Sequence, residues 1–399
     1  MLTPPTLAAA SGLIEAVVDK HLAELLDLRR DLHAHPELAF AEQRTTDAVA
    51  GAMERAGWRV TRPAATGLLA DLGDDGPLVA LRADLDALPV EDTTGDPWAS
   101  TRPGIAHACG HDVHTTCLVG AGLALAELHA QGGLPGRVRL VFQPAEEMMP
   151  GGALLMMEHG ALAGVEHVFA LHCDPSIDVG TVGLREGPLT GAADSIDVRL
   201  TGKGGHTSRP HLTEDLTFAL GKLITELPAI LSRTMDPRAG VSVVWGIVQA
   251  GGAPNVIPAS GRVAGTIRML DAVAWADAER LVRRMVGQII APYGVEAAIT
   301  YHRGVPPVVN RHGPTQLLGA AIERVVGEAG HVATSQSLGG EDFGWFLESV
   351  PGAMARLGTR TPGGPTYDLH QGDLRVDERS IALGARVLAE AAVGAITHP

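Results

Sequence analysis

Residues 107–114 form the strongest group of potential metal ligands in the chain. The octapeptide His-Ala-Cys-Gly-His-Asp-Val-His places three imidazoles, a thiol and a carboxylate in a loop that contains glycine and leads into a predicted helix. Thiolate, imidazole and carboxylate groups are the ligands that zinc and related divalent cations take in proteins. This density predicts a metal site or a catalytic site rather than a loop that serves packing alone.

Two adjacent acids, Glu146 and Glu147, follow an apolar strand that we expect at residues 138–143. At a strand end, desolvation and mutual repulsion of the two carboxylates are costly unless a cation lies nearby. Because side chains alternate along an extended chain, one acid can bind a metal while the other transfers a proton. We favour this interpretation over the alternative, a solvated strand end.

His172 ends another apolar strand, expected at residues 165–172, and His370 lies near the C-terminus. A single histidine of this kind is more often a packing or surface residue than a ligand. The carboxyl ends of parallel strands, however, lie along one edge of a sheet, so these groups can converge on one point. The remaining cysteines, Cys117 and Cys173, are expected to serve packing.

The order of the predicted elements indicates an α/β fold. Apolar strands alternate with helices over the first half of the chain, which favours a mainly parallel sheet covered by helices on both faces. Residues 191–303 then follow the order strand, helix, strand, strand, helix, strand, which is that of a ferredoxin-like α+β unit. We therefore expect a catalytic domain of residues 1–190 and 304–399, interrupted by an inserted satellite domain of residues 191–303.

The net charge and the cysteine count of the chain limit the kinds of partner and compartment that we expect. The chain has 399 residues and a formal net charge of -15, with no compensating cluster of Lys and Arg. That charge repels nucleic acid and anionic lipid, so a small-molecule substrate is expected, with no nucleic acid and no membrane as partner. The first 20 residues do not resemble a secretory signal, and an odd count of 3 cysteines suits a reducing compartment. We expect a cytoplasmic protein.

Seven segments, in order along nearly the whole chain, resemble the aminoacylase and carboxypeptidase-type metallopeptidases. The resemblance is closest to the branch of hippurate hydrolase and indole-acetyl-amino-acid hydrolase. It implies a zinc-peptidase-like catalytic domain and hydrolysis of the amide bond of N-acyl amino acids, with release of a carboxylate and a free amino acid. The matching segments are residues 29–37, 81–89, 107–114, 143–147, 204–208, 254–258 and 340–343.

The resemblance also implies a binuclear site with two divalent metal ions per subunit, of which Mn, Zn and Co are all candidates. Glu146 is then the general base that takes a proton from a water activated by the metals. Two cations about 3.5 to 4 Å apart acidify a shared water and polarise the amide carbonyl. Asp84 and Asp86 are expected either beside the ligands or in a plain strand-end turn. The implied protein ligands are Cys109, His111, Glu147, His172 and His370.

The satellite domain supplies further candidates. In the related family a histidine matching His206 reaches the active site of a partner subunit and binds the oxyanion or the substrate, which implies a homodimer or higher homo-oligomer. Asn255 resembles a neighbouring substrate-binding amide. Arg268 could pair with the substrate carboxylate through its planar guanidinium, or could be an ordinary charge on a strand face. His33 and His35 are expected to be structural.

Two other functions stay open. A dipeptidase or carboxypeptidase would accept a free α-amine where an acyl group is expected here. A non-catalytic metal-binding scaffold is the alternative from another class, although Glu146 and every implied ligand are present. The chain has neither a G-x-S-x-G nor an H-E-x-x-H motif, which disfavours a serine hydrolase and a mononuclear zinc peptidase.

Overall fold

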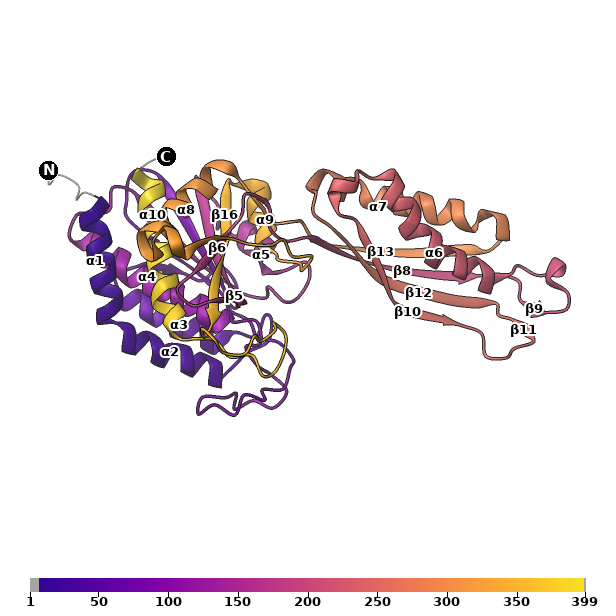
Figure 1. Ribbon diagram of the computed structural model, residues 1–399, viewed down its shortest axis with the longest axis horizontal. Helices are drawn as coiled ribbons and strands as arrows, with labels where there is room; N and C mark the ends of the chain where they lie inside the picture. The colour runs from indigo at the N-terminus through magenta and orange to yellow at the C-terminus, as the bar shows by residue number, and fades with distance from the viewer. Residues whose placement is uncertain (1–6, 398–399) are drawn as a thin grey trace. The chain divides into compact units, whose positions relative to one another are not determined.

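The computed structural model describes residues 7–397, and the chain divides into two compact units (Figure 1). Unit 1 comprises Met1–Gly187, Val309–Ser335 and Trp345–Pro399, and unit 2 comprises Pro188–Val308 and Gln336–Gly344. The range expected for the satellite domain, 191–303, therefore lies within unit 2. The chain first passes between the units within the short strand β7 (Gly187–Pro188) and returns at the start of β14 (Val309–Asn310); the segment Gln336–Gly344 belongs to unit 2 as well.

Unit 1 is built on an eight-stranded sheet in the order β1-β2-β4-β3-β5-β16-β6-β15. Its four middle strands, β4, β3, β5 and β16, are parallel to one another, which confirms the predicted α/β fold with a mainly parallel sheet. Strand β3 is buried along its whole length, as expected of a strand covered on both faces. The strands are β1 (Arg59–Thr61), β2 (Leu68–Leu72), β3 (Leu78–Asp84), β4 (Arg137–Gln143), β5 (His167–Asp178), β6 (Val182–Leu184), β15 (His331–Ala333) and β16 (Gly352–Arg360).

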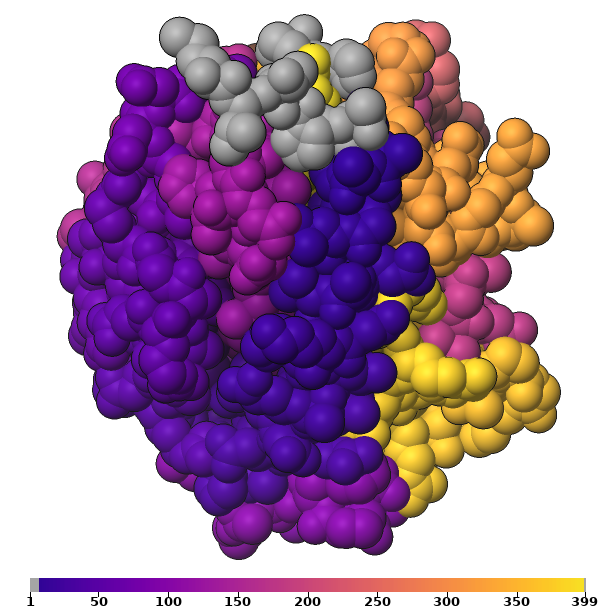
Figure 2. Space-filling view, turned by 90° about the vertical axis from the view of Figure 1, so that its left-hand side faces the viewer, coloured from indigo at the N-terminus to yellow at the C-terminus, as the bar shows by residue number. Residues whose placement is uncertain are grey.

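Helices cover both faces of this sheet (Figure 1). The C-terminal helix α10 packs against α4, α8 and α1, and Figure 2 shows the N-terminal segment, in indigo, lying against the C-terminal segment, in yellow. Helix α10 is long and apolar enough to cross a membrane, but 78% of its apolar window is buried inside the protein, so it is a core helix. The helices are α1 (Leu7–Lys20), α2 (Leu22–Ala34), α3 (Gln43–Arg55), α4 (His111–Ala130), α5 (Gly152–Glu158), α8 (His312–Val326), α9 (Phe343–Ser349) and α10 (Arg379–Thr397).

The central strand β16 was not predicted from the sequence. Its residues run Gly-Ala-Met-Ala-Arg-Leu-Gly-Thr-Arg, and nearly all of them are buried, so no alternation of polar and apolar residues marks the strand. Small side chains let it lie close to β5: a Cβ atom added at Gly352 would come within 2.2 Å of the Val168 carbonyl oxygen. The short strands β1, β2, β6 and β15 were missed as well.

Unit 2 has the ferredoxin-like element order that the sequence predicted. Its four-stranded antiparallel sheet runs in the order β10-β12-β8-β13, with helices α6 and α7 packed on it. A two-stranded ladder of β9 and β11 joins two of its loops. The elements are β8 (Ala192–Thr201), β9 (Gly205–His206), α6 (Leu216–Thr234), β10 (Ser242–Ala250), β11 (Val256–Ile257), β12 (Ser260–Met269), α7 (Ala272–Ile290) and β13 (Glu296–Val305).

Candidate metal centre

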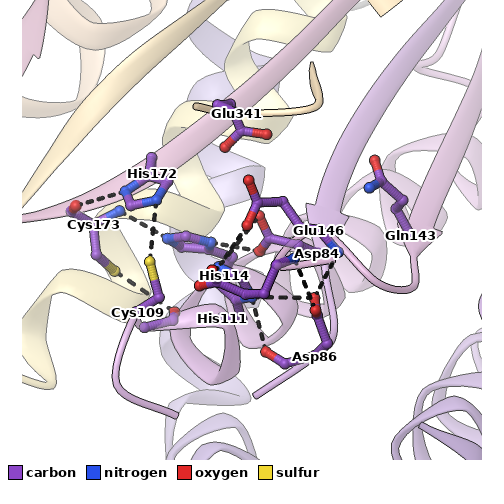
Figure 3. Close-up of polar contacts among 12 residues, drawn as sticks. Asp84, Asp86, Cys109, His111, His114, Gln143, Glu146, His172, Cys173 and Glu341 are labelled. Carbon is purple, nitrogen blue, oxygen red and sulfur yellow. Dashed lines mark hydrogen bonds and ion pairs between the residues drawn. The ribbon is translucent and has the colours of Figure 1, made fainter. Parts of the chain in front are cut away.

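The candidate ligands come from segments far apart in the sequence and meet near the carboxyl ends of the parallel strands. Figure 3 shows three of them, Cys109, His111 and His172. Cys109 and His111 flank Gly110, which precedes helix α4 with a left-handed φ of 85°. That position favours glycine, because a Cβ atom there would also lie 2.9 Å from the Cys173 Sγ atom. His172 lies on β5, which continues beyond the predicted strand end to Asp178.

Two groups of three ligand atoms share one thiol. Cys109, His111 and His172 form the first group, and Cys109, Glu147 and His370 form the second; within each group the ligand atoms lie within 4.8 Å of one another. Two overlapping groups with a common sulfur match the arrangement needed to hold two cations side by side. The structure thus brings together all of the ligands implied by the sequence resemblance.

Hydrogen bonds turn two of these imidazoles toward the centre. The Nδ1 atom of His111 lies 2.8 Å from the Asp86 carbonyl oxygen, and that of His172 lies 2.8 Å from the Cys173 carbonyl oxygen. A carbonyl oxygen only accepts, so each Nδ1 donates and each neutral ring keeps a lone pair on Nε2. The buried Nε2 of His111 has no hydrogen-bond partner, and that of His172 lies 3.6 Å from the Cys109 sulfur. Both rings therefore fit a metal.

His114 and Asp84 lie beside the centre, but their polar atoms are already engaged. The Nδ1 atom of His114 is 2.6 Å from Asp84 Oδ1, and its Nε2 accepts the Cys173 backbone N–H at 2.7 Å. The other Asp84 oxygen accepts from the buried guanidinium of Arg82 at 2.7 Å. These residues hold the strand that carries His172 in place. This network could not be found from the sequence, because it joins three separate segments.

The Asp86 carboxylate binds the backbone of the two adjacent glutamates. Its Oδ1 accepts the Glu146 backbone N–H at 2.9 Å and its Oδ2 accepts that of Glu147 at 3.0 Å. One carboxylate thus holds the backbone of both residues in place. The Oε1 atom of Glu147 is buried without a hydrogen bond and lies 3.3 Å from His370 Nε2, in the second group of ligands. A cation between these atoms would satisfy both.

The electrostatics of the centre also fit a cation. Burial raises the pKa of the Cys109 thiol to about 12, so the sulfur is neutral at physiological pH unless a metal binds it. Burial lowers the pKa of His172, which keeps that ring neutral and able to coordinate. The nearby carboxylate of Glu147 raises the pKa of His370. Sulfur, nitrogen and carboxylate donors together suit a borderline transition metal such as zinc.

A buried charge network lies next to the centre, at the start of α4. Asp112 Oδ2 is 2.9 Å from Arg29 Nε and 2.7 Å from His33 Nδ1. Although burial alone lowers it, the pKa of His33 is raised overall, because Asp112 and Asp92 favour the protonated ring. His35, by contrast, is only partly buried and caps its own helix through the Asp31 carbonyl oxygen at 2.8 Å.

Unit 2 contains the three remaining candidate site residues, His206, Asn255 and Arg268. His206 on β9 pairs with Val256, the residue after Asn255, so these two candidates are neighbours. The Nδ1 of His206 accepts the Ser208 backbone N–H at 3.1 Å, so in the neutral ring Nε2 carries the proton. Arg268 donates one Nη1 hydrogen bond to the Leu338 carbonyl oxygen at 2.6 Å.

Residues 80–393 match the peptidase family M20/M25/M40. The chain belongs to this family. The match confirms the resemblance seen in the sequence and the class of enzyme, a hydrolase that acts on amide bonds.

Several known proteins are similar to this chain over most of its length. A protein of Rhodococcus jostii named putative glutamate–cysteine ligase 2-3 is 50% identical over 92% of the chain, which spans only 46% of that protein. The N-acetyl-L-cysteine deacetylase of Bacillus subtilis is 38% identical over 92% of this chain and 87% of its own length. A crystal structure from Bacillus subtilis, described as a dinuclear metal-binding peptidase of family M20, is 33% identical with a TM-score of 0.82, covering 96% of this chain and 100% of that one.

Proposed function

We propose that this M20 hydrolase cleaves the amide bond of N-acyl amino acids at a site for two divalent cations. The observation that carries the proposal is the pair of ligand groups that share Cys109, with Glu146 next to them. The similarity to an N-acetyl-L-cysteine deacetylase supports the choice of substrate class. Manganese, zinc and cobalt are the candidate metals. The proposed ligands are Cys109, His111, Glu147, His172 and His370.

Two bound cations would polarise the amide carbonyl and acidify water in the site. The chain's own part is to position groups and move a proton. Glu146, held by Asp86, takes the proton of the attacking water and then delivers it to the leaving nitrogen. Glu147 is held by the same aspartate but takes part in the second ligand group, so the two adjacent acids divide binding and proton transfer between them.

The test of this function is release of free amine from a panel of N-acetyl and N-benzoyl amino acids, beginning with N-acetylcysteine. Metal-stripped protein reconstituted separately with Mn, Zn and Co is expected to turn over several members, and protein without metal none. Dipeptides are assayed beside their acylated analogues. Faster cleavage of the dipeptides would favour a peptidase and contradict the proposal. No metal-dependent release on any member would favour the non-catalytic scaffold.

We infer that unit 2 provides the remaining groups. His206 would donate its Nε2 hydrogen to the developing oxyanion of a partner subunit, Asn255 would bind the substrate, and Arg268 would pair with the substrate carboxylate. A homodimer is supported by strand β10, the edge of its sheet, on which Val244 and Val248 are exposed. A long apolar edge strand presents unpaired backbone groups with which another chain can pair.

Complementation of two inactive variants tests whether His206 acts in the partner. His206→Ala and Glu146→Gln should each be nearly inactive. In a mixed dimer one site would combine an intact Glu146 with an intact His206, so co-expression should restore about a quarter of wild-type activity under random pairing. Each variant co-expressed with itself is the control. No recovery, or a monomeric mass with full activity, would rule out the partner role.

We also infer a cytoplasmic location and a small-molecule substrate, with neither nucleic acid nor membrane as partner. The three cysteines are all free and buried, which suits a reducing compartment. The net charge of -15 disfavours polyanionic partners.

A further inference from the structure

Unit 1 leaves three large hydrophobic side chains exposed among its described residues, and all of them lie on segments joined to the loop that carries Glu146 and Glu147. Among the described residues of this unit, the exposed ones are Phe40 at 44%, Met148 at 50% and Met149 at 47%. The two methionines follow Glu146 and Glu147 directly. Exposed apolar side chains on segments that adjoin a functional site indicate a surface that a ligand covers.

Phe40 is tied to the same loop through Glu42. The buried carboxylate of Glu42 accepts the Phe40 backbone N–H at 3.0 Å and the Ala145 backbone N–H at 2.8 Å, both on Oε1. The backbone of Phe40 therefore lies against the residue that precedes Glu146. One side chain thus joins the N-terminal segment to the loop with the catalytic glutamate.

Unfavourable backbone conformations also occur in the segments that adjoin the candidate metal centre. Three non-glycine residues among those described have a positive φ: Phe40 at 60°, Ala145 at 55° and His370 at 63°. Ala145 precedes Glu146, and His370 belongs to the second ligand group. A left-handed conformation is unfavourable for a bulky aromatic residue, and such strain is retained mainly at functional sites. Phe40 shares this property with two residues of the metal centre.

The loop that carries the methionines is held firmly. The Met148 carbonyl oxygen accepts the Gly151 N–H at 2.7 Å, and the Ala145 carbonyl oxygen accepts the Gly152 N–H at 2.8 Å. Trp345 Nε1 donates to the Pro150 carbonyl oxygen at 3.1 Å. The backbone is thereby fixed, while the unbranched methionine side chains can adapt to ligands of different shape.

We propose that Phe40, Met148 and Met149 form a binding subsite for the acyl group of the substrate, with preference for aliphatic chains longer than acetyl. This inference rests on the proposed hydrolysis of N-acyl amino acids. Residues 36–42 and 144–152 contain no Lys or Arg, and Glu146 and Glu147 adjoin the patch. A substrate carboxylate would be repelled there, whereas a neutral acyl chain would cover the exposed side chains.

The test measures kcat/KM for N-acetyl, N-butanoyl, N-hexanoyl and N-octanoyl derivatives of one amino acid. For the wild type we expect a rise of about two- to fourfold per methylene group that reaches the patch, carried mainly by KM. We expect a much smaller rise of kcat/KM with acyl-chain length in two variants. One carries Met148→Gln together with Met149→Gln, and the other carries Phe40→Gly. Glycine relieves the positive φ at residue 40, so thermal stability should not fall and a folding defect can be recognised. The matched control is Val273→Gln, at an 81% exposed valine of unit 2, which should keep the slope.

The outcomes separate the two proposals. Hydrolysis of the N-acetyl substrate with a flat slope in the wild type would overturn the subsite and leave the proposed function standing. A second series keeps the acetyl group and varies the amino acid from polar to increasingly apolar. It tests the opposite orientation, in which the amino-acid side chain lies on the patch. If the variants lose preference in that series instead, the patch binds the amino-acid side chain and the inference is wrong. Hydrolysis of no member of either series would overturn the proposed function itself.

Discussion

Replacing Glu146 with glutamine is expected to lower kcat by about a thousandfold while both cations still bind. The amide has nearly the shape of the carboxylate but cannot accept the proton of the attacking water. The Glu146 backbone N–H would keep its hydrogen bond to Asp86, so the loop should not move. The measurements are kcat on the best N-acyl substrate and metal content by mass spectrometry, on protein reconstituted with the same metal.

The control for this substitution is Glu158→Gln, at an exposed glutamate at the end of α5 in the same unit, which should change neither quantity. Unchanged thermal stability of Glu146→Gln would show that the loss is chemical. If the variant retained more than about a tenth of the wild-type kcat, Glu146 would not be the base. Loss of a metal ion together with activity would instead make it a ligand.

The second large effect is expected from His111→Ala. His111 belongs to the ligand group with Cys109 and His172, and its buried Nε2 makes no hydrogen bond within the protein. Alanine would leave one cation with only a thiol and one imidazole of that group. We expect the metal content to fall from two ions to about one per subunit, with kcat/KM lowered by at least about a thousandfold.

Metal stoichiometry is the readout that distinguishes this effect from general damage to the fold. His129→Ala, at an exposed position near the other end of α4, is the matched histidine control and should keep full metal content and activity. Circular dichroism should report the same helix content for both variants. Two tightly bound ions in His111→Ala would remove this residue from the ligand set.

The residues of the centre could be predicted from the sequence because their chemistry is concentrated locally. Residues 107–114 hold Cys109 and His111 two positions apart, and Glu146 and Glu147 are adjacent. The βαββαβ order of unit 2 could also be predicted, since each of its elements has a clear period or turn. Strand β16 could not, because a fully buried strand of small residues shows no alternation.

The amino-acid sequence by itself therefore determined the class of fold and named the candidate ligands and the candidate general base. Only the tertiary structure decided which buried imidazole groups keep an atom free of hydrogen bonds for coordinating a metal. His111 and His114 are three residues apart, yet the Nε2 of His111 lacks a partner while that of His114 accepts the Cys173 N–H. Likewise, Glu42 accepts hydrogen bonds from both Phe40 and Ala145, the second of which lies 103 positions further along the chain. A hydrogen bond between distant segments depends on how the strands and loops pack, and no local pattern of residue types records it.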